Sequence, residues 1–353
     1  MIYQYVHSLK KGDAIGNEVV AIREYLLNCH MDNLIVKFAP DIPQKGTIFI
    51  DEFEKKVRPE DLLIVHYAWV LPDLIWKKMK AFSCRKIMIY HNITPAEFFL
   101  PYDKKTAKAS VAARAQLQEG ARVFEAAWGV SSYNVEELAS LGYKNVSVLP
   151  LLISFPDYQK EPNRALMERL KDGYKNILFV GRMVPNKCFE DIIFAFAEYK
   201  KQYDPESRLI LVGNDDLKTY VYKLQNFCRD QKIKDVVFRA HCPFSDILAY
   251  YRSADLFLCM SEHEGFCVPL IESMIFEVPI MAYSACAVPD TLGDGGICFT
   301  DKDPSKVARI MDVLFHDEEL RRSMIGNQKK QLQRFDPEVI LKEMLAKIRQ
   351  YQG

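Results

Sequence analysis

The sequence predicts an α/β protein made of two doubly wound domains with parallel sheets. Three observations support this: a length of 353 residues, a mix of 49% hydrophobic and 27% charged residues, and short apolar runs that alternate with amphipathic segments throughout. Because a domain has about 100–200 residues, the length favours two domains over one. Strands that alternate with helices imply right-handed βαβ units, and two such sets imply two domains.

The first half of the chain supplies one set of elements. Each expected strand is a short apolar run, and each expected helix is a longer segment with apolar residues at helical spacing. The expected strands are Ile2–Val6, Leu34–Phe38, Leu62–His66, Lys86–Tyr90, Trp128–Val130 and Val146–Leu149, and the expected helices are Gly16–Asn28 and Ala107–Ala126. We therefore expect a first domain over residues 1–160.

The second half repeats this architecture without repeating the sequence. Its expected strands are Ile177–Val180, Leu209–Val212, Val236–Phe238, Leu256–Cys259, Ile280–Tyr283 and Ile297–Phe299. Its expected helices are Phe189–Tyr203, Asp216–Gln231, Pro269–Glu277, Glu318–Gln333 and Pro337–Tyr351. Prolines and a charged segment precede these elements, so a linker is expected at residues 161–173 and a second domain at 174–336.

Composition excludes several classes of protein. The 47 Lys and Arg balance 47 Asp and Glu, whereas a general nucleic-acid binder carries a basic excess. A disordered chain would have far fewer apolar residues. No apolar run reaches the ~18 residues that span a bilayer, and the first ten residues do not resemble a signal peptide. The nine cysteines include no C-x-x-C pair, which indicates free thiols in a reducing, cytoplasmic compartment.

The segment Leu256–Glu277 is the most informative for function. A buried strand is followed by a loop with Glu264, and Glu272 lies about one turn into the next helix. In open α/β sheets ligands bind outside the carboxyl ends of the strands, where this loop lies. A carboxylate accepts hydrogen bonds from two vicinal hydroxyls, so a ribose or a hexose suits either glutamate, although solvated surface charge is the alternative. Backbone amides would point into the same crevice from Gly265, Phe266 and Cys267.

A second segment, Asn176–Lys187, carries cations at a strand end. An apolar strand leads directly into Gly181 and Arg182, and Lys187 precedes the helix that begins at Phe189. An Arg fork, a Lys point charge and a helix amino terminus together suit a pyrophosphate. Two solvated surface cations are the alternative interpretation.

These two segments resemble the donor site of family 4 retaining glycosyltransferases, which have the GT-B fold. The likeness extends over nearly the whole chain, and Gly12–Asn17 and Tyr90–Pro95 resemble motifs of a bacterial branch that builds surface polysaccharides and includes mannosyltransferases. The resemblance implies two Rossmann-like domains whose parallel sheets face each other across a cleft. It also implies an acceptor-binding first domain, a second domain that binds the nucleotide sugar, and a final helix that returns residues 337–353 to the first domain.

The resemblance also assigns roles to particular residues. Arg182 and Lys187, next to Gly181, would bind the donor diphosphate, and Glu272 would bind the ribose hydroxyls. Glu264 would bind hydroxyls of the transferred sugar, together with the amides of Gly265, Phe266 and Cys267. From the first domain, His91 would lie near that sugar, and the loop with Gly12 and Gly16 would approach the phosphates.

Two cysteines depart from the family pattern. Cys188 and Cys267 stand where the family usually has glycine. Both keep a backbone N–H, so contacts through the amide can persist. A position that requires a positive φ would favour glycine over cysteine.

The resemblance implies a metal-independent hexosyltransferase that needs no cofactor. Its donor would be a nucleotide diphosphate sugar, with GDP-mannose as the first choice, and its acceptor a glycan or a lipid-linked sugar. A front-face reaction fits better than double displacement, because no carboxylate is obviously set beside the anomeric carbon. The alternatives are a nucleotide-sugar 2-epimerase and a non-catalytic subunit that binds sugar nucleotides.

Two further features have less specific interpretations. The Asp301-Lys302-Asp303 motif imitates a metal-binding D-x-D, but it precedes Pro304 and is predicted to cap a helix. Between Lys77 and Arg122 the chain has an excess of cations, which gives the hypothesis of peripheral docking at the inner membrane face; solvated helix faces are the alternative. The ten cations are Lys77, Lys78, Lys80, Arg85, Lys86, Lys104, Lys105, Lys108, Arg114 and Arg122.

Overall fold

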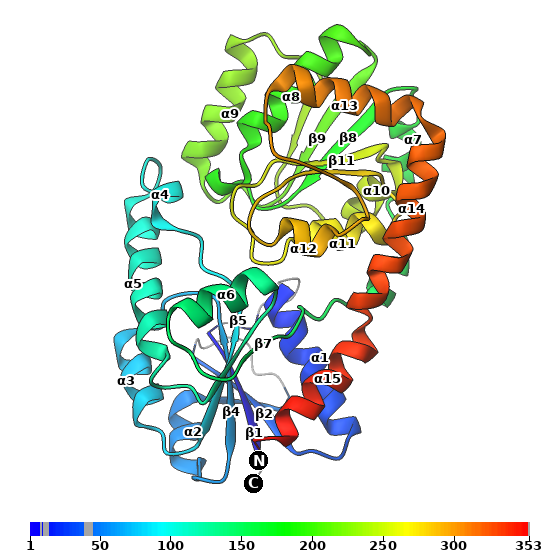
Figure 1. Cartoon of the computed structure of the whole chain (residues 1–353). Coiled ribbons are helices and arrows are strands. Elements are labelled where there is room, and N and C mark those ends of the chain that lie inside the picture. Colours follow the sequence, from blue (N-terminus) through cyan, green and yellow to red (C-terminus); the bar gives the residue numbers. More distant parts are fainter. Residues whose placement is uncertain (8, 10–13, 39–44, 352–353) are drawn as a thin grey trace. The chain divides into compact units, whose positions relative to one another are not determined.

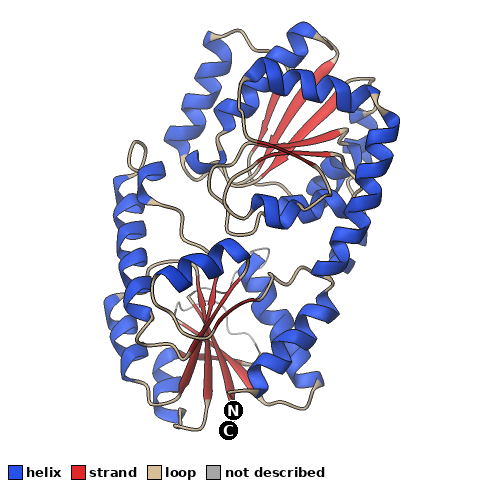
Figure 2. Ribbon diagram, viewed as in Figure 1, coloured by secondary structure: helices blue, strands red, loops and turns tan. Residues whose placement is uncertain are grey.

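A computed structural model describes residues 1–7, 9, 14–38 and 45–351 of the chain (Figure 1). The chain divides into two compact units. The first comprises Met1–Ala96, Lys105–Ile153 and Phe335–Gly353, and the second comprises Glu97–Lys104 and Ser154–Arg334. Each unit has one parallel sheet with helices on both faces (Figure 2). The two doubly wound α/β units expected from the sequence are thus confirmed.

The sheet of the first unit has seven strands among the described residues, in the order β3-β2-β1-β4-β5-β6-β7. The strands are β1 (Ile2–Val6), β2 (Asn33–Lys37), β3 (Thr47–Phe49), β4 (Leu62–Tyr67), β5 (Arg85–Tyr90), β6 (Ala126–Gly129) and β7 (Val146–Val148). Every residue of β1 and β4 is buried, because helices cover both faces of a parallel sheet. The strand order reverses between these two strands, which pair side by side.

The helices of the first unit connect and cover these strands. They are α1 (Ala14–Asn28), α2 (Ile50–Lys56), α3 (Asp73–Ala81), α5 (Lys104–Gly120), α6 (Ser132–Ser140) and α15 (Pro337–Arg349), with the short α4 (Ala96–Phe99) beside the unit boundary. The last helix, α15, packs against α1. It begins after the cap residue Asp336, whose carboxylate accepts hydrogen bonds from the first amides of the helix.

The second unit has six strands among the described residues, in the order β10-β9-β8-β11-β12-β13. The strands are β8 (Lys175–Val180), β9 (Ser207–Val212), β10 (Val236–Arg239), β11 (Leu256–Cys259), β12 (Ile280–Tyr283) and β13 (Ile297–Phe299). Its helices are α7 (Arg164–Leu170), α8 (Phe189–Gln202), α9 (Lys218–Asp230), α10 (Phe244–Ser253), α11 (Val268–Ile275), α12 (Val288–Leu292), α13 (Pro304–His316) and α14 (Glu318–Leu332), with the 3-10 turns η1 (Phe155–Gln159), η2 (Pro185–Lys187) and η3 (Gln333–Phe335). Strand order reverses between β8 and β11, the two strands that precede the predicted donor residues.

The chain passes very close to itself where β8 and β9 end. A Cβ atom on Gly213 would lie 1.8 Å from the carbonyl oxygen of Gly181, so only glycine fits after β9. The backbone there is fixed by hydrogen bonds from the Gly181 amide to Val212 and from the Gly213 amide to Arg239.

The structure differs from the predicted elements in several places, of which three matter here. The helix expected at Ala107–Ala126 is α5, which begins at Lys104 and ends at Gly120, because Ala126 already starts β6. The short β3 was not among the expected strands. The expected linker, residues 161–173, contains α7, which packs against α10, and the division between the units falls earlier, after Ile153.

Candidate active site

The predicted donor residues of the second unit follow β8 and β11, at the point where the strand order reverses. This is where open α/β sheets bind ligands. Arg182 lies just beyond the end of β8 and is exposed. Its side chain forms no ion pair with any residue that the structure describes. The guanidinium is therefore available to an anion from solution.

Lys187 and Glu264 form an ion pair, with 2.5 Å between Lys187 Nζ and Glu264 Oε1. The two side chains are only 17% and 8% exposed. Burial acts to lower the pKa of Lys187, but the Glu264 carboxylate outweighs it, so the pKa is raised and the lysine stays charged. The sequence assigned these residues to the diphosphate and to the sugar separately; the structure joins them.

Asn186 ties the same two loops together. Its side-chain Nδ2 donates to the backbone carbonyl of His263 over 2.9 Å. The backbone carbonyl of Asn186 accepts from the backbone amide of Glu262, also over 2.9 Å. The β8 and β11 loops are therefore held in register beside the ion pair. Sequence reasoning did not single out Asn186, since a loop asparagine carries no distinctive signal.

Glu272, in α11, accepts hydrogen bonds from two tyrosines. Tyr158 of η1 donates to Oε1 over 2.8 Å, and Tyr251 of α10 donates to Oε2 over 2.6 Å. Burial raises the pKa of Glu272 although both hydrogen bonds act to lower it. Each carboxylate oxygen can accept a further hydrogen bond, so the tyrosines orient the group without exhausting it. Neither tyrosine is near Glu272 in sequence, and sequence reasoning missed both.

The loop after Glu264 is fixed through its carbonyl groups. The carbonyl of Glu264 accepts from the amide of Ala287 over 3.3 Å, and the carbonyl of Phe266 accepts from the Thr291 hydroxyl over 2.6 Å. This arrangement holds the predicted run of Gly265, Phe266 and Cys267 at the start of α11.

Both cysteines that replace the family's glycines adopt a left-handed conformation. Cys188 has φ 51° and ψ 52° and precedes α8, and Cys267 has φ 70° and ψ 65° and precedes α11. A residue with a Cβ atom is strained by about 1–2 kcal/mol in this region. The loops therefore keep a glycine-type backbone although they carry cysteine.

At position 267, a glycine variant should be more stable than an alanine variant, which is the reverse of the usual order within a helix. We expect Cys267→Gly to be more stable than Cys267→Ala by about 1 kcal/mol, because only glycine relieves the strain. Cys228, buried within α9, is the matched control: there alanine should be better than glycine by about 1 kcal/mol. Urea unfolding of the four variants measures both differences, and the same ranking at both positions would contradict strain at Cys267.

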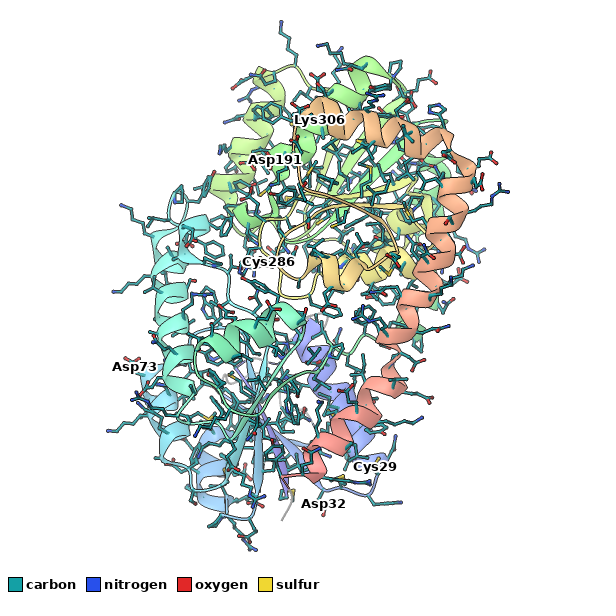
Figure 3. The ribbon with its side chains drawn as sticks, in the orientation of Figure 1. Cys29, Asp32, Asp73, Asp191, Cys286 and Lys306 are labelled. Carbon is teal, nitrogen blue, oxygen red and sulfur yellow. The ribbon has the colours of Figure 1, made fainter. Side chains whose placement is uncertain are left out.

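The D-x-D motif caps a helix, as predicted. Asp303 is the N-cap of α13, and its side chain accepts from the amide of Lys306. Lys302 is the middle residue of the motif, and its Nζ lies 2.7 Å from Asp191 Oδ2 and 2.8 Å from Glu262 Oε1. Asp191 lies in the first turn of α8 (Figure 3). Lys302 therefore links the loop after β13 to the loops that carry the donor residues.

Two of the predicted site residues of the first unit, Gly16 and His91, are described by the structure. Gly12 lies outside the described residues. Gly16 is buried in the first turn of α1. His91 follows β5, and its amide donates to the carbonyl of Tyr67 over 2.9 Å.

His91 belongs to a buried cluster that the sequence did not reveal, here called the Glu18–His66–His91 cluster. His91 Nε2 lies 3.1 Å from His66 Nδ1, and Glu18 Oε2 lies 3.5 Å from each of these nitrogens. Burial lowers the pKa of His66 to about 3 and that of His91 to about 4, so both rings are neutral. Burial also raises the pKa of Glu18. The three residues come from α1, β4 and the loop after β5, and no spacing in the sequence connects them.

Comparison with known proteins finds a family-model match within the second unit. Residues 166–331 match the family model described as "Glycosyl transferases group 1". A D-inositol 3-phosphate glycosyltransferase of Corynebacterium kroppenstedtii is 30% identical over 165 residues, which are 45% of this chain and 37% of the relative. The capsular polysaccharide biosynthesis glycosyltransferase CapM of Staphylococcus aureus is 25% identical over 209 residues, 54% and 51% of the two chains. The chain thus spans about half or less of the length of these curated relatives.

Solved structures resemble the whole chain. HepE of Anabaena, solved in complex with UDP and glucose, is 17% identical, covers 99% of both chains and has a TM-score of 0.76. This likeness shows the fold: two Rossmann-like domains of the GT-B type, as predicted.

Proposed function

We propose that the chain is a retaining, metal-independent glycosyltransferase that moves a sugar from a nucleotide diphosphate sugar to a hydroxyl of a glycan or lipid-linked acceptor, in surface-polysaccharide synthesis. The observation that carries this proposal is the set of groups at the β8 and β11 ends: the exposed Arg182, the Lys187–Glu264 ion pair, and Glu272 held by two tyrosines. It supplies cations for a diphosphate and carboxylates for hydroxyls. The match of residues 166–331 to the group 1 family model supports the same function.

In this proposal each group has one chemical task. Arg182 and Lys187 neutralise the diphosphate as it leaves, assisted by the amino terminus of α8. Glu272 accepts from the ribose hydroxyls, and Glu264 from a hydroxyl of the transferred sugar. The bond between the anomeric carbon and the leaving phosphate oxygen breaks, and the acceptor oxygen bonds to that carbon on the same face, so the anomeric configuration is retained. The departing phosphate oxygen takes the acceptor proton.

A donor panel tests the proposal. We expect sugar transfer from GDP-mannose in the presence of a glycan acceptor, with UDP-glucose as the comparison donor. Epimerised sugar and free nucleotide without acceptor would identify an epimerase instead. Binding without turnover of any donor would identify a non-catalytic subunit, and either result would overturn the proposal. A thermal-shift screen of GDP, UDP, ADP and dTDP shows which nucleotide base the protein prefers, because a ligand at about 100 times Kd adds ~2.7 kcal/mol of stability.

Substitution of Glu272 and substitution of Glu264 should impair different steps, the first nucleotide binding and the second turnover. Glu272→Gln is expected to weaken binding of the free nucleoside diphosphate about tenfold or more, because a hydrogen bond to a charged group contributes about 1.5–3 kcal/mol. Glu264→Gln should preserve that affinity and lower turnover, because the proposed contact of Glu264 is with the sugar. Calorimetric titration and kcat of both variants decide the matter. Equal loss of nucleotide affinity in the two variants would contradict this division of roles.

Peripheral membrane docking is a separate part of the proposal. Of the ten cations between Lys77 and Arg122, Lys78 is paired with Asp51 and Glu54, Lys80 with Glu119, and Arg114 with Glu137. Lys104 and Lys108, at the start of α5, are exposed, and they are the cations that we propose for an anionic surface. No helix of the described part of the chain is long and apolar enough to cross a bilayer.

Lys104 and Lys108 should govern vesicle binding. Replacing both by glutamine is expected to weaken binding to anionic vesicles by about 30-fold, since each cation near the surface contributes ~1 kcal/mol. Sedimentation with phosphatidylserine-containing vesicles and with neutral vesicles measures the effect. Equal binding of the wild-type chain to both vesicle types would refute docking by charge.

A further inference from the structure

We infer that Gln4 and His66 are positioning residues that hold His91 in a single tautomer, in which His91 Nδ1 accepts a hydrogen bond from a hydroxyl group of a ligand. The two rings of the Glu18–His66–His91 cluster are neutral, and His66 Nδ1 lies 3.1 Å from His91 Nε2. The ring planes are only 14° apart, so the lone pair of one nitrogen can point at the proton of the other. Only one of these two nitrogens carries that proton.

Gln4 decides which nitrogen carries it. A backbone carbonyl can only accept, so the group of Gln4 that lies 3.2 Å from the carbonyl oxygen of Val19 is the donor Nε2. The other group, Oε1, can only accept, and it lies 3.2 Å from His66 Nε2. The proton of His66 is therefore on Nε2, which leaves a lone pair on His66 Nδ1. His91 Nε2 is then the donor across the 3.1 Å contact.

Glu18 supports this hydrogen bond without choosing its direction. Its Oε2 lies 3.5 Å from both His66 Nδ1 and His91 Nε2, so this oxygen attracts the shared proton equally from either side. Its Oε1 accepts from the backbone amide of Leu152 over 3.0 Å, which fixes the carboxylate in place. The direction of the hydrogen bond between the two rings therefore depends on Gln4.

The opposite nitrogen of His91 is left as an acceptor. With the proton on Nε2, Nδ1 has a lone pair, and it is buried without a hydrogen-bond partner among the described residues. A buried acceptor without a partner costs free energy, and a donor group of a ligand would satisfy it. A hydroxyl group can donate, whereas an ionised phosphate oxygen cannot. His91 therefore differs from Arg182 and Lys187, whose charges suit an anion.

The inference rests on the proposed function only for the source of the hydroxyl group. A glycosyltransferase has two substrates with sugar hydroxyls, the nucleotide sugar and the acceptor, and both offer the donor group that Nδ1 requires. The tautomer follows from contacts within the first unit alone. It can therefore be tested separately from the reaction.

NMR of the wild-type chain with ¹⁵N-labelled histidine tests the tautomer without measuring activity. We expect a proton with a one-bond coupling to His91 Nε2 and a coupling through the hydrogen bond to His66 Nδ1, with His91 Nδ1 unprotonated. The loss of signals in His66→Gln and His91→Gln assigns the two rings. A proton bonded to His66 Nδ1 or to His91 Nδ1 would overturn the inference, because His91 would then present a donor to its ligand.

Gln4→Leu tests the positioning role of Gln4. Leucine has a similar volume but no acceptor for His66 Nε2, so we expect both rings to become mixtures of tautomers. Gln328→Leu is the matched control, because Gln328 is also buried and donates to the backbone carbonyl of Val278 over 2.9 Å in the second unit. It should leave both tautomers unchanged. Wild-type tautomers in folded Gln4→Leu would overturn the role of Gln4, and if this variant does not fold, the spectrum of the wild-type chain decides.

Ligand titrations of the labelled wild-type chain identify the hydroxyl group. The probes are GDP-mannose and UDP-glucose, with GDP and UDP as controls that lack the sugar, and methyl α-mannoside as an acceptor sugar. A shift of the His91 Nδ1 resonance with a nucleotide sugar but not with its nucleoside diphosphate assigns the hydroxyl to the donor sugar, and a shift with methyl α-mannoside assigns it to the acceptor. No shift at saturation with any of these sugars would overturn the ligand role of His91.

Affinities separate this inference from the proposed function. If the donor sugar supplies the hydroxyl, Gln4→Leu should weaken binding of the nucleotide sugar by about 2–10-fold, the contribution of one neutral hydrogen bond, and leave binding of the nucleoside diphosphate unchanged. Equal weakening of both would show a general structural effect and overturn the positioning role. Failure of the wild-type chain to bind any nucleotide sugar would overturn the proposed function instead, and the spectrum of the free chain would still decide the tautomer.

Discussion

Arg182→Ala is expected to lower kcat by about 10²–10³ while leaving the melting temperature unchanged. A departing nucleoside diphosphate gains negative charge in the transition state, and a fixed donor aimed at that charge typically contributes ~2.7–4 kcal/mol. Arg182 is exposed and forms no ion pair with described residues, so its removal should not disturb the fold. Arg182→Lys should retain only part of the activity, because lysine cannot offer the bidentate fork.

Steady-state kinetics at saturating donor, with thermal melts of the same samples, measure this effect. Arg169→Ala is the matched control, since Arg169 is also an exposed arginine of the second unit. The wild-type enzyme should need no added Mg²⁺ or Mn²⁺. Turnover that depends on either ion, together with full activity of Arg182→Ala, would show that a metal meets the diphosphate charge instead.

The Lys187–Glu264 ion pair should dominate a double-mutant cycle of stability. Lys187→Met and Glu264→Leu are each expected to lower the free energy of unfolding by about 3–5 kcal/mol, because each leaves a buried charge without its partner. The double variant should be much more stable than the sum of the single losses predicts, since two apolar side chains of similar size replace both charges.

Denaturant unfolding of the four proteins gives the coupling energy. The exposed pair Lys171–Glu168 is the control, with side chains 63% and 70% exposed and a much smaller expected coupling. Additive losses at Lys187 and Glu264 would mean that the two charges do not interact, and the proposed preorganisation of the donor site would lose its basis.

The sheets were predictable because parallel strands are buried on both faces and read as continuous apolar runs. The bounds of β1, β11, β12 and β13 were predicted to the residue. The short β3 was missed, since three residues between charged and turn-forming neighbours carry too little pattern. Helix ends were less accurate, as at α5, because the apolar spacing continues past Gly120 into the next turn.

The positions of the proposed donor residues in the fold were predictable individually, but their contacts with one another were not. Each follows a recognisable strand, so its position at a sheet edge can be derived from topology. The ion pair between Lys187 and Glu264 depends on how two loops close, and the partners of Glu272 come from η1 and α10. Glu18 was not singled out from the sequence, yet it is 2% exposed. Contacts between residues that are far apart in the sequence cannot be recognised from a local sequence pattern.

Because α15 belongs to the first unit, the unit that begins the chain is the last to have all of its residues synthesised. Residues 154–334 form nearly all of the second unit, so they leave the ribosome together and can fold as one body. The first unit, although it begins the chain, waits for α15 to cover α1. During translation, the apolar face of α1 that α15 covers is therefore exposed until the final helix emerges, and this is the interval in which a chaperone or an adjacent nascent chain has access to it.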